Sequence, residues 1–176
     1  MAKGIYVLGR AKKYFDEITL KELYYAFIHP YFSYCNEVWG GTYSSYIDPL
    51  LKLQKRAIRI VAGVARDYHT LELFQNYNII PVDKLHKYNL YIFLFKLVNK
   101  KLPVGIQSSF IFNNQVHHYF TRQADDLHID KIKSESRRRA LRHQVSILYS
   151  SNSDVDYAVS FPCFKFIIKT MLLNSD

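Results

Sequence analysis

Cysteine, glycine and proline are all scarce in this sequence of 176 residues, and each scarcity excludes a class of protein. Six glycines and five prolines argue against a repetitive β-fold and against a disordered chain. The two cysteines, Cys35 and Cys163, lie far apart without CxxC spacing, which argues against a disulfide framework and a zinc knuckle. We therefore expect a protein of the reducing interior of the cell.

Long hydrophobic runs are missing as well. A membrane-spanning helix needs about 18 consecutive apolar residues, and the nearest candidate, residues 90–98, is half that length and contains Lys96. Residues 1–15 mix charged with apolar residues and lack the continuous apolar core of a signal peptide. We therefore expect neither a transmembrane helix nor a secretory leader.

Aromatic residues and positive charge are abundant instead. The 15 Tyr and 12 Phe predict a core and a half-buried rim of large rings, with a base-stacking surface as the alternative. The net charge of +9 and the pI near 9.4 favour an anionic partner, nucleic acid before an acidic membrane.

Apolar residues recur at helical spacing through most of the chain, which predicts a mainly α fold, a helical bundle. A capping box at Thr19–Glu22 and a kink or stop at His29, before Pro30, mark one predicted helix. Residues 90–98 are apolar nearly all round, which predicts the most buried element. The predicted helical segments are 3–15, 19–29, 31–38, 45–64, 70–77, 81–101 and 161–173.

The sequence changes character after Pro103. Residues 105–130 lose periodicity and predict a loop, and 110–112 and 145–149 are candidates for short strands. A soft boundary near residue 104 divides the chain into two predicted domains. They are a helical thumb-like bundle over 1–104 and a basic, less regular C-terminal segment with a terminal helix over 105–176.

The predicted helix 45–64 begins near Ser45, with Pro49 placed in its first turn. On a helical wheel its apolar residues fill about half the circle, interrupted only by Gln54, and four cations lie within about 100° on the far side. These cations are Lys52, Lys55, Arg56 and Arg59. Val64 falls on the apolar half.

A face that merely keeps a helix soluble usually mixes signs, yet no acidic residue occurs between Leu50 and Ala65. We therefore favour phosphate contact over a solvated face, and such contacts position a duplex without reading its sequence. A second basic cluster consists of Arg137, Arg138, Arg139 and Arg142. It is a candidate nucleic-acid-binding arm, with a localisation signal or a solvated surface tract as alternatives. Trp39 and Tyr34 offer rings for base stacking, but their apolar neighbours favour burial.

Several motifs in one order carry a family resemblance. The stretch LYYAFIHPYFSYCNEVWGG, followed by LLKLQKRAIRI, resembles the segment after the polymerase palm in reverse transcriptases of LINE-type, jockey-like non-LTR retrotransposons. Further pieces that resemble the family follow in the same order, so the resemblance spans about residues 8–173. They are Leu73-Phe74 with 79–82, the Y…F…K…LP pattern of 88–103, the H-x-Y-x-TR loop of 118–122, and 164–173.

The resemblance implies a fragment or relic of an RNA-directed DNA polymerase. This part would be non-catalytic and would contact the primer–template duplex or the element's RNA, with the missing palm or another protein chain as a further partner. It implies a location in the nucleus or in a cytoplasmic ribonucleoprotein, and magnesium bound only in the missing palm. The family's Trp-Asn-x-Leu-Pro element is replaced here by the polar stretch 149–160.

Catalytic and metal-binding residues are not expected in this chain. Asp125-Asp126 imitates the palm motif, but its polar context TRQADDLH predicts a solvated acidic turn. The histidines 117, 118 and 128 lack the spacing and the neighbouring cysteines of a zinc site. We expect no polymerase activity from this chain by itself. The alternatives are a protein-interaction or non-functional helical bundle and, less favoured, a binder of membrane surfaces.

Overall fold

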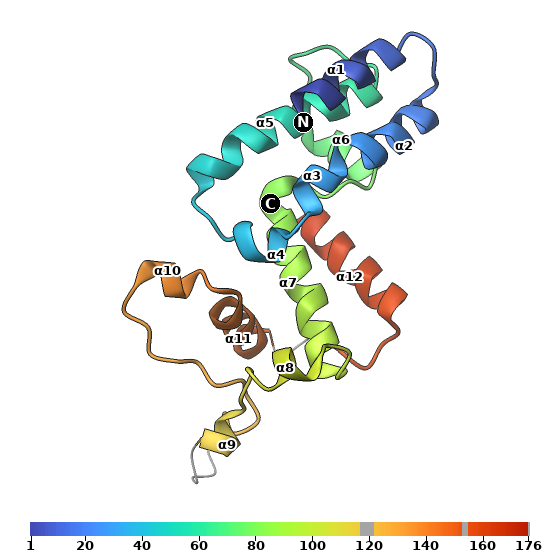
Figure 1. Cartoon of the computed structure of the whole chain (residues 1–176). Coiled ribbons are helices and arrows are strands. Elements are labelled where there is room, and N and C mark those ends of the chain that lie inside the picture. Colours follow the sequence, from blue (N-terminus) through green and yellow to red (C-terminus); the bar gives the residue numbers. More distant parts are fainter. Residues whose placement is uncertain (117–121, 153–154, 176) are drawn as a thin grey trace. The chain divides into compact units, whose positions relative to one another are not determined.

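The computed structural model describes residues 1–116, 122–152 and 155–175, and this part of the chain is mainly helical (Figure 1). Helices account for 64% and no strand is assigned among the described residues, which confirms the predicted mainly α, bundle-like fold class. The helices up to the middle of the chain are α1 (Ala2–Ala11), α2 (Glu17–Phe27), α3 (His29–Ser33), α4 (Asn36–Trp39), α5 (Ser44–Val61), α6 (Leu71–Asn76) and α7 (Val82–Val98). The remaining helices are α8 (Val104–Gln107), α9 (Asn113–Val116), α10 (Glu135–Arg138), α11 (Leu141–Ser151) and α12 (Phe161–Asn174).

The chain forms two compact units. The first unit comprises Met1–His86 with Lys169–Asp176, and the second unit comprises Lys87–Ile168. The divisions therefore fall inside α7 and α12. The domain boundary near residue 104, which rests on a change in sequence character, stays a prediction.

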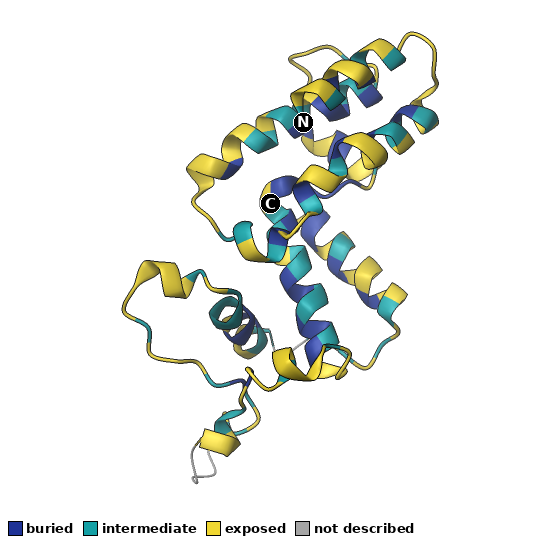
Figure 2. Cartoon of the chain, viewed as in Figure 1, coloured by how far each residue is buried: buried dark blue, intermediate teal, exposed yellow. Residues whose placement is uncertain are grey.

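The core of the first unit is formed where α1, α2 and α5 pack against one another. Each helix contributes apolar side chains from one face, as amphipathic helices of a bundle do, and exposed residues alternate with them (Figure 2). The buried apolar residues of these helices are Ile5, Leu8, Leu20, Tyr24, Ile47, Ala57, Ile58 and Val61. This packing fixes α5, and with it the basic face of α5.

Two predicted helix starts are wrong. Helix α2 begins at Glu17 rather than at a capping box on Thr19, because the Asp16 carboxylate accepts a hydrogen bond from the Thr19 backbone N–H at 3.2 Å. Hydrogen bonds from Thr19, first from its side chain and second from its backbone N–H, lower the pKa of Asp16. Helix α5 begins at Ser44, so Pro49 lies inside the helix and not in its first turn. Helix α5 ends at Val61, and Gly63 follows in the left-handed region with φ +70°, so Val64 lies beyond the helix.

The turn after α4 depends on a close approach of the backbone. A Cβ atom on Gly40 would lie 2.6 Å from the Asn36 carbonyl oxygen and 2.6 Å from His86 Nδ1. His86 Nδ1 itself lies 3.0 Å from the same carbonyl oxygen, which ties α7 to Asn36, the first residue of α4. The predicted stop near Pro30 is confirmed, because α2 ends at Phe27 and α3 starts again at His29.

Helices α6 and α7 occur where the sequence predicts them, with differences at their ends. Thr70 stands at the N-cap of α6, but its side chain makes no capping hydrogen bond. Helix α7 begins at Val82, directly after Pro81, and ends at Val98 rather than at 101. It ends there because Lys100 is left-handed with φ +54° and the Lys101 N–H donates to the Lys96 carbonyl at 2.7 Å.

The second unit packs aromatic rings from α7 and α12 together. The ring of Phe95 lies 4.6 Å from that of Phe164 and 5.3 Å from that of Phe161, measured between centroids. The candidate strand 145–149 is wrong, because these residues lie inside α11. The candidate strand 110–112 is reduced to one isolated antiparallel bridge between Phe112 and Leu127.

Candidate nucleic-acid interface

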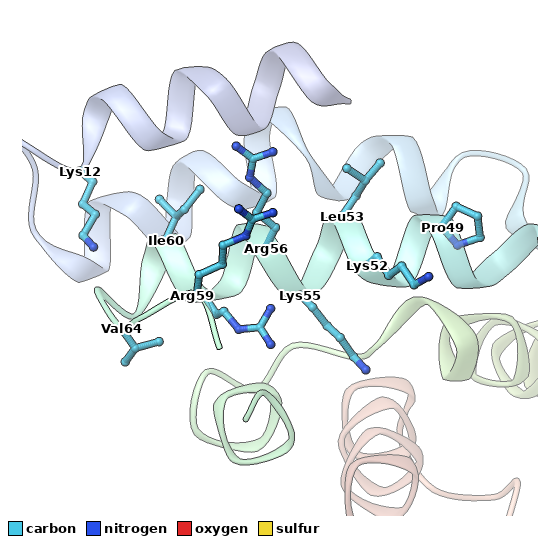
Figure 3. A pocket seen from close by; sticks show the side chains of 10 residues that line it. Lys12, Pro49, Lys52, Leu53, Lys55, Arg56, Arg59, Ile60 and Val64 are labelled. Carbon is cyan, nitrogen blue, oxygen red and sulfur yellow. The ribbon is translucent and has the colours of Figure 1, made fainter. Parts of the chain in front are cut away.

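Helix α5 places four cationic side chains along one open side of the first unit. Lys52, Lys55, Arg56 and Arg59 stand at positions i, i+3, i+4 and i+7, so they share one face of the helix. All four line a groove with a volume of about 860 Å³ (Figure 3). We call it the basic groove, and its described lining residues are Lys12, Pro49, Lys52, Leu53, Lys55, Arg56, Arg59, Ile60, Val64 and Arg66.

Two lining cations come from outside α5 and were not predicted. Lys12 is the C-cap residue of α1, which packs against α5, and Arg66 lies in the segment that follows α5. Figure 3 shows Lys12 at one end of the groove, beyond the α5 side chains. Lys12 stands in a local cluster of basic residues with Arg10 and Lys13, whereas no sequence pattern marks Arg66.

The floor of the basic groove is apolar. Leu53 and Ile60 belong to the apolar half of the helical wheel, yet both are only half-buried and line the groove. Pro49 and Val64 add further alkyl surface. The groove therefore presents charged side chains around a hydrocarbon surface.

No carboxylate neutralises these cations within the described part of the chain. None of the described acidic residues forms an ion pair, at the 4.0 Å limit, with Lys12, Lys52, Lys55, Arg56, Arg59 or Arg66. Like charges held on one face repel one another, and an anionic ligand removes that repulsion. The electrostatics of the groove thus favour a polyanion.

One of the cations is held by the backbone. Arg59 Nε donates a hydrogen bond to the Tyr68 carbonyl oxygen at 2.8 Å. This bond uses one edge of the guanidinium group and leaves its two terminal nitrogens to reach other acceptors. Arg59 therefore presents a fixed fork, the geometry that pairs with phosphate through two parallel hydrogen bonds.

The second basic cluster lies in the second unit and has acidic partners. Arg138 and Arg139 pair with Glu135 at 3.6 and 3.2 Å, and Arg142 pairs with Asp130 at 3.6 Å. Arg137 and Arg138 lie in α10, whose N-cap Ser134 accepts from the Arg137 N–H, and Arg139 follows as its C-cap. These exposed ion pairs are individually weak, but they make the local field less positive than that of the basic groove.

Gln54, the polar residue on the apolar half of the helical wheel, has a structural role. Gln54 is fully buried, and its Nε2 donates to the Tyr24 hydroxyl and to the Ile80 carbonyl, both at 2.9 Å. Its Oε1 accepts from the Val82 N–H at 2.7 Å. Gln54 thus joins α5 to α2 and to the start of α7, and burial raises the pKa of Tyr24.

Trp39 and Tyr34, the two candidates for base stacking, differ in how far their rings are exposed. Trp39 is half-buried, and its Nε1 donates to the Tyr34 carbonyl at 2.7 Å. Tyr34 is 79% exposed, so its predicted burial is wrong. The reason is that Tyr34 follows the short helix α3, whose buried residue is Phe32.

The acidic pair and the histidines form no metal centre among the described residues. Asp125 and Asp126 lie in a turn, where the Asp126 N–H donates to the Gln123 carbonyl. The described residues contain no group of three or more His, Cys, Asp or Glu that could hold a metal ion, so they offer no fit for the magnesium of a polymerase palm. His117, His118 and most of the H-x-Y-x-TR motif lie outside the described residues.

No protein-family model, curated protein or solved structure matches this chain. Within the described residues, every helix falls short of the length and apolar character that crossing a bilayer requires.

Proposed function

We propose that the basic groove binds the phosphate backbone of RNA or of an RNA–DNA duplex. We propose further that the chain is a non-catalytic piece of a LINE-type reverse transcriptase, the thumb-like region after the palm. The single observation that supports binding most strongly is the groove itself. It gathers six cations from three segments around an apolar floor, with no carboxylate of the described residues in ion-pair range.

A charge-reversal variant tests the binding proposal. Changing Lys52, Lys55, Arg56 and Arg59 to Glu removes four phosphate contacts and introduces repulsion, so duplex affinity in a filter-binding titration falls at least about 100-fold. A matched variant controls for net charge. Lys3, Lys13, Lys87 and Lys100 are exposed and outside the groove, and changing them to Glu also lowers the net charge from +9 to +1, because each exchange removes two positive charges.

The comparison between the two variants decides the proposal. The control variant keeps affinity within about fivefold of the original chain if binding is local to the groove. Equal losses in both variants would show that only net charge matters. No loss in the groove variant would overturn the proposal. Circular dichroism of both variants verifies that the helices remain.

A second candidate function is protein interaction, which one specific feature favours. Large apolar side chains between α3 and the first turn of α5 are 54–79% exposed. They are Tyr31, Tyr34, Val38, Tyr43 and Tyr46. Exposed apolar side chains that lie close together mark interaction sites, and the ring centroids of Tyr43 and Tyr46 are 6.5 Å apart. Sedimentation velocity distinguishes the candidates, because an orphaned apolar surface causes self-association, whereas a self-contained binding module stays monodisperse.

A further inference from the structure

A pocket with a volume of about 310 Å³ lies within the second unit. Its lining comes from α10, α11 and the segments that precede them. Arg137 and Arg142 of the second basic cluster line this pocket together with Lys131, whereas Arg138 and Arg139 do not. We call it the second-unit pocket. It divides the second basic cluster into arginines that line a hollow and arginines that lie outside it.

The lining of the second-unit pocket has an excess of positive charge. Lys131, Arg137 and Arg142 share the lining with a single carboxylate, that of Asp130. These groups leave a net charge of +2 before any contribution from the two histidines of the lining. Asp130 pairs with Arg142 at 3.6 Å, and no described acidic residue lies in ion-pair range of Lys131 or Arg137. A ligand with two negative charges would therefore neutralise the lining.

His128, one of the two lining histidines, is held through both nitrogens of its ring. Its Nδ1 lies 3.0 Å from Asn113 Oδ1, and the Asn113 amide is oriented because its Nδ2 donates to the Gln123 carbonyl at 2.8 Å. An amide oxygen only accepts, so His128 Nδ1 carries a hydrogen. His128 Nε2 lies 3.6 Å from Asp130 Oδ1, while Asp130 Oδ2 lies 3.6 Å from Arg142 Nη2. One carboxylate thus positions an imidazole and a guanidinium group in the lining.

Alkyl side chains complete the second-unit pocket. They belong to Ile129, Ile132 and Ala140, and Ile129 is 39% exposed although it lines a hollow. Pockets that hold small molecules begin at about 300 Å³. The second-unit pocket therefore has room for a charged group with a compact apolar part, and it is too small to enclose a segment of duplex.

We infer that the second-unit pocket binds a small phosphomonoester, with the phosphate against the cations and the organic part against the alkyl side chains. A phosphomonoester carries a charge of about −1.5 to −2 at pH 7, which matches the +2 of the lining. Its oxygens accept hydrogen bonds from guanidinium groups and from imidazoles, which keep at least one N–H donor in every protonation state. A carboxylate or a phosphodiester brings one negative charge and leaves part of the lining without a counter-charge.

The test is a nuclear magnetic resonance titration of the full, ¹⁵N-labelled chain at about pH 7.5, where a phosphomonoester is a dianion. The probes are phenyl phosphate, inorganic phosphate, dimethyl phosphate and benzoate. We expect phenyl phosphate to shift the amides of residues 128–143 and to bind at least about tenfold tighter than the two monoanions. It should bind at least about threefold tighter than inorganic phosphate, because its ring covers alkyl surface. Equal binding of dimethyl phosphate, or shifts confined to the basic groove, would overturn the inference.

Neighbouring cations provide a matched pair of variants. Lys131→Gln with Arg137→Gln removes two charges from the lining, and we expect phenyl phosphate to bind at least about tenfold more weakly. Lys133→Gln with Arg138→Gln removes the same charge from residues that do not line the pocket, so the expected change is less than about twofold. Equal losses in the two variants would show that only net charge matters and would overturn the inference.

The second-unit pocket is independent of the proposed function, and the charge-reversal variant of α5 separates the two. We expect this variant to bind phenyl phosphate as the original chain does while it loses duplex binding. If it keeps both, the proposed function fails and the inference stands. If it keeps its helices by circular dichroism but no longer binds phenyl phosphate, the ligand occupies the basic groove and the inference is wrong.

Discussion

Gln54 shows how a single residue couples three helices. Its amide satisfies the Tyr24 hydroxyl, the Ile80 carbonyl and the Val82 N–H, all in a buried place. Gln54→Leu leaves these groups without a partner, and each buried unsatisfied group costs on the order of 1–3 kcal/mol. We expect a loss of about 3 kcal/mol in the free energy of unfolding, measured with urea. Lys55→Leu, one residue along on the open side, serves as control, and a loss below about 1 kcal/mol for Gln54→Leu would contradict this role.

Gly40 is a second residue whose identity the packing requires. Any side chain there meets the Asn36 carbonyl and His86 at 2.6 Å. Gly40→Ala therefore forces the end of α4 away from α7, and we expect a loss of about 2 kcal/mol in urea unfolding. Gly105→Ala is the matched control, because nothing lies within 4 Å of the added methyl group. An equal free energy of unfolding for the two variants would show that the turn after α4 accommodates a side chain without loss of stability.

Arg59 is the cation whose geometry, and not only its charge, is expected to matter. Lysine keeps the charge but cannot hold the Tyr68 carbonyl and a phosphate together through one planar group. We expect Arg59→Lys to weaken duplex binding about fivefold. Arg56→Lys, on the same face, is expected to change it less than about twofold, because Arg56 is exposed. Equal effects in filter binding would refute a special role for Arg59.

At the scale of elements, α3 carries a pH-sensitive histidine. His29 Nδ1 is buried and has no hydrogen-bond partner among the described residues, and its ring lies 5.2 Å from that of Tyr25. Burial, and secondarily the charge of Lys169, lowers the pKa of His29 below its ordinary value of 6.5. As the pH falls below about 6.5, the unfolded chain takes up this proton first, so stability is lost until the folded-state pKa is reached.

We expect the urea midpoint of the original chain to decrease as the pH is lowered from about 7.5 to about 5.5. His29→Phe keeps a ring in place and removes the titrating group, so its midpoint changes less over the same range. The comparison between the two chains isolates His29 from the carboxylates, which titrate in both. An identical pH dependence would show that His29 does not contribute.

The helices themselves were largely predictable, and the failures have local causes. The spacing of apolar residues predicted α1, α5, α6, α7 and α12, because a buried face leaves a period that the sequence shows directly. Residues 145–149 are a short apolar run, and such a run does not distinguish a strand from a buried helical segment. The start of α2 was missed because Asp16 and Thr19 both suit a cap, and only one is used.

At the scale of the whole molecule, the candidate site was only partly predictable. The four cations of α5 followed from the wheel, since they lie on one helix. Lys12 and Arg66 did not, because their approach depends on how α1 and the segment after α5 pack. The groove itself could not be foreseen either, because the wheel places Leu53 and Ile60 on its apolar half, opposite the cations, and yet both line the groove.

The two basic clusters belong to different compact units and differ in their surroundings. In the second basic cluster Arg138 and Arg139 pair with Glu135 and Arg142 pairs with Asp130, whereas the groove cations have no such partner among the described residues. We expect charge reversal at Arg137, Arg138, Arg139 and Arg142 to lower duplex affinity less than reversal in the groove, by about tenfold or less. Filter binding at equal salt measures the difference, and a larger effect in the second unit would place the main contact there.

The salt dependence of binding tests the central claim most directly. A groove that contacts about three to five phosphates predicts a slope of log affinity against log salt of about −3 to −5 for a duplex. Reversal of Lys52, Lys55, Arg56 and Arg59 removes most of these contacts and is predicted to flatten the slope to about −1 or less in magnitude. A slope that is unchanged by this variant would contradict the assignment of the basic groove as the nucleic-acid interface.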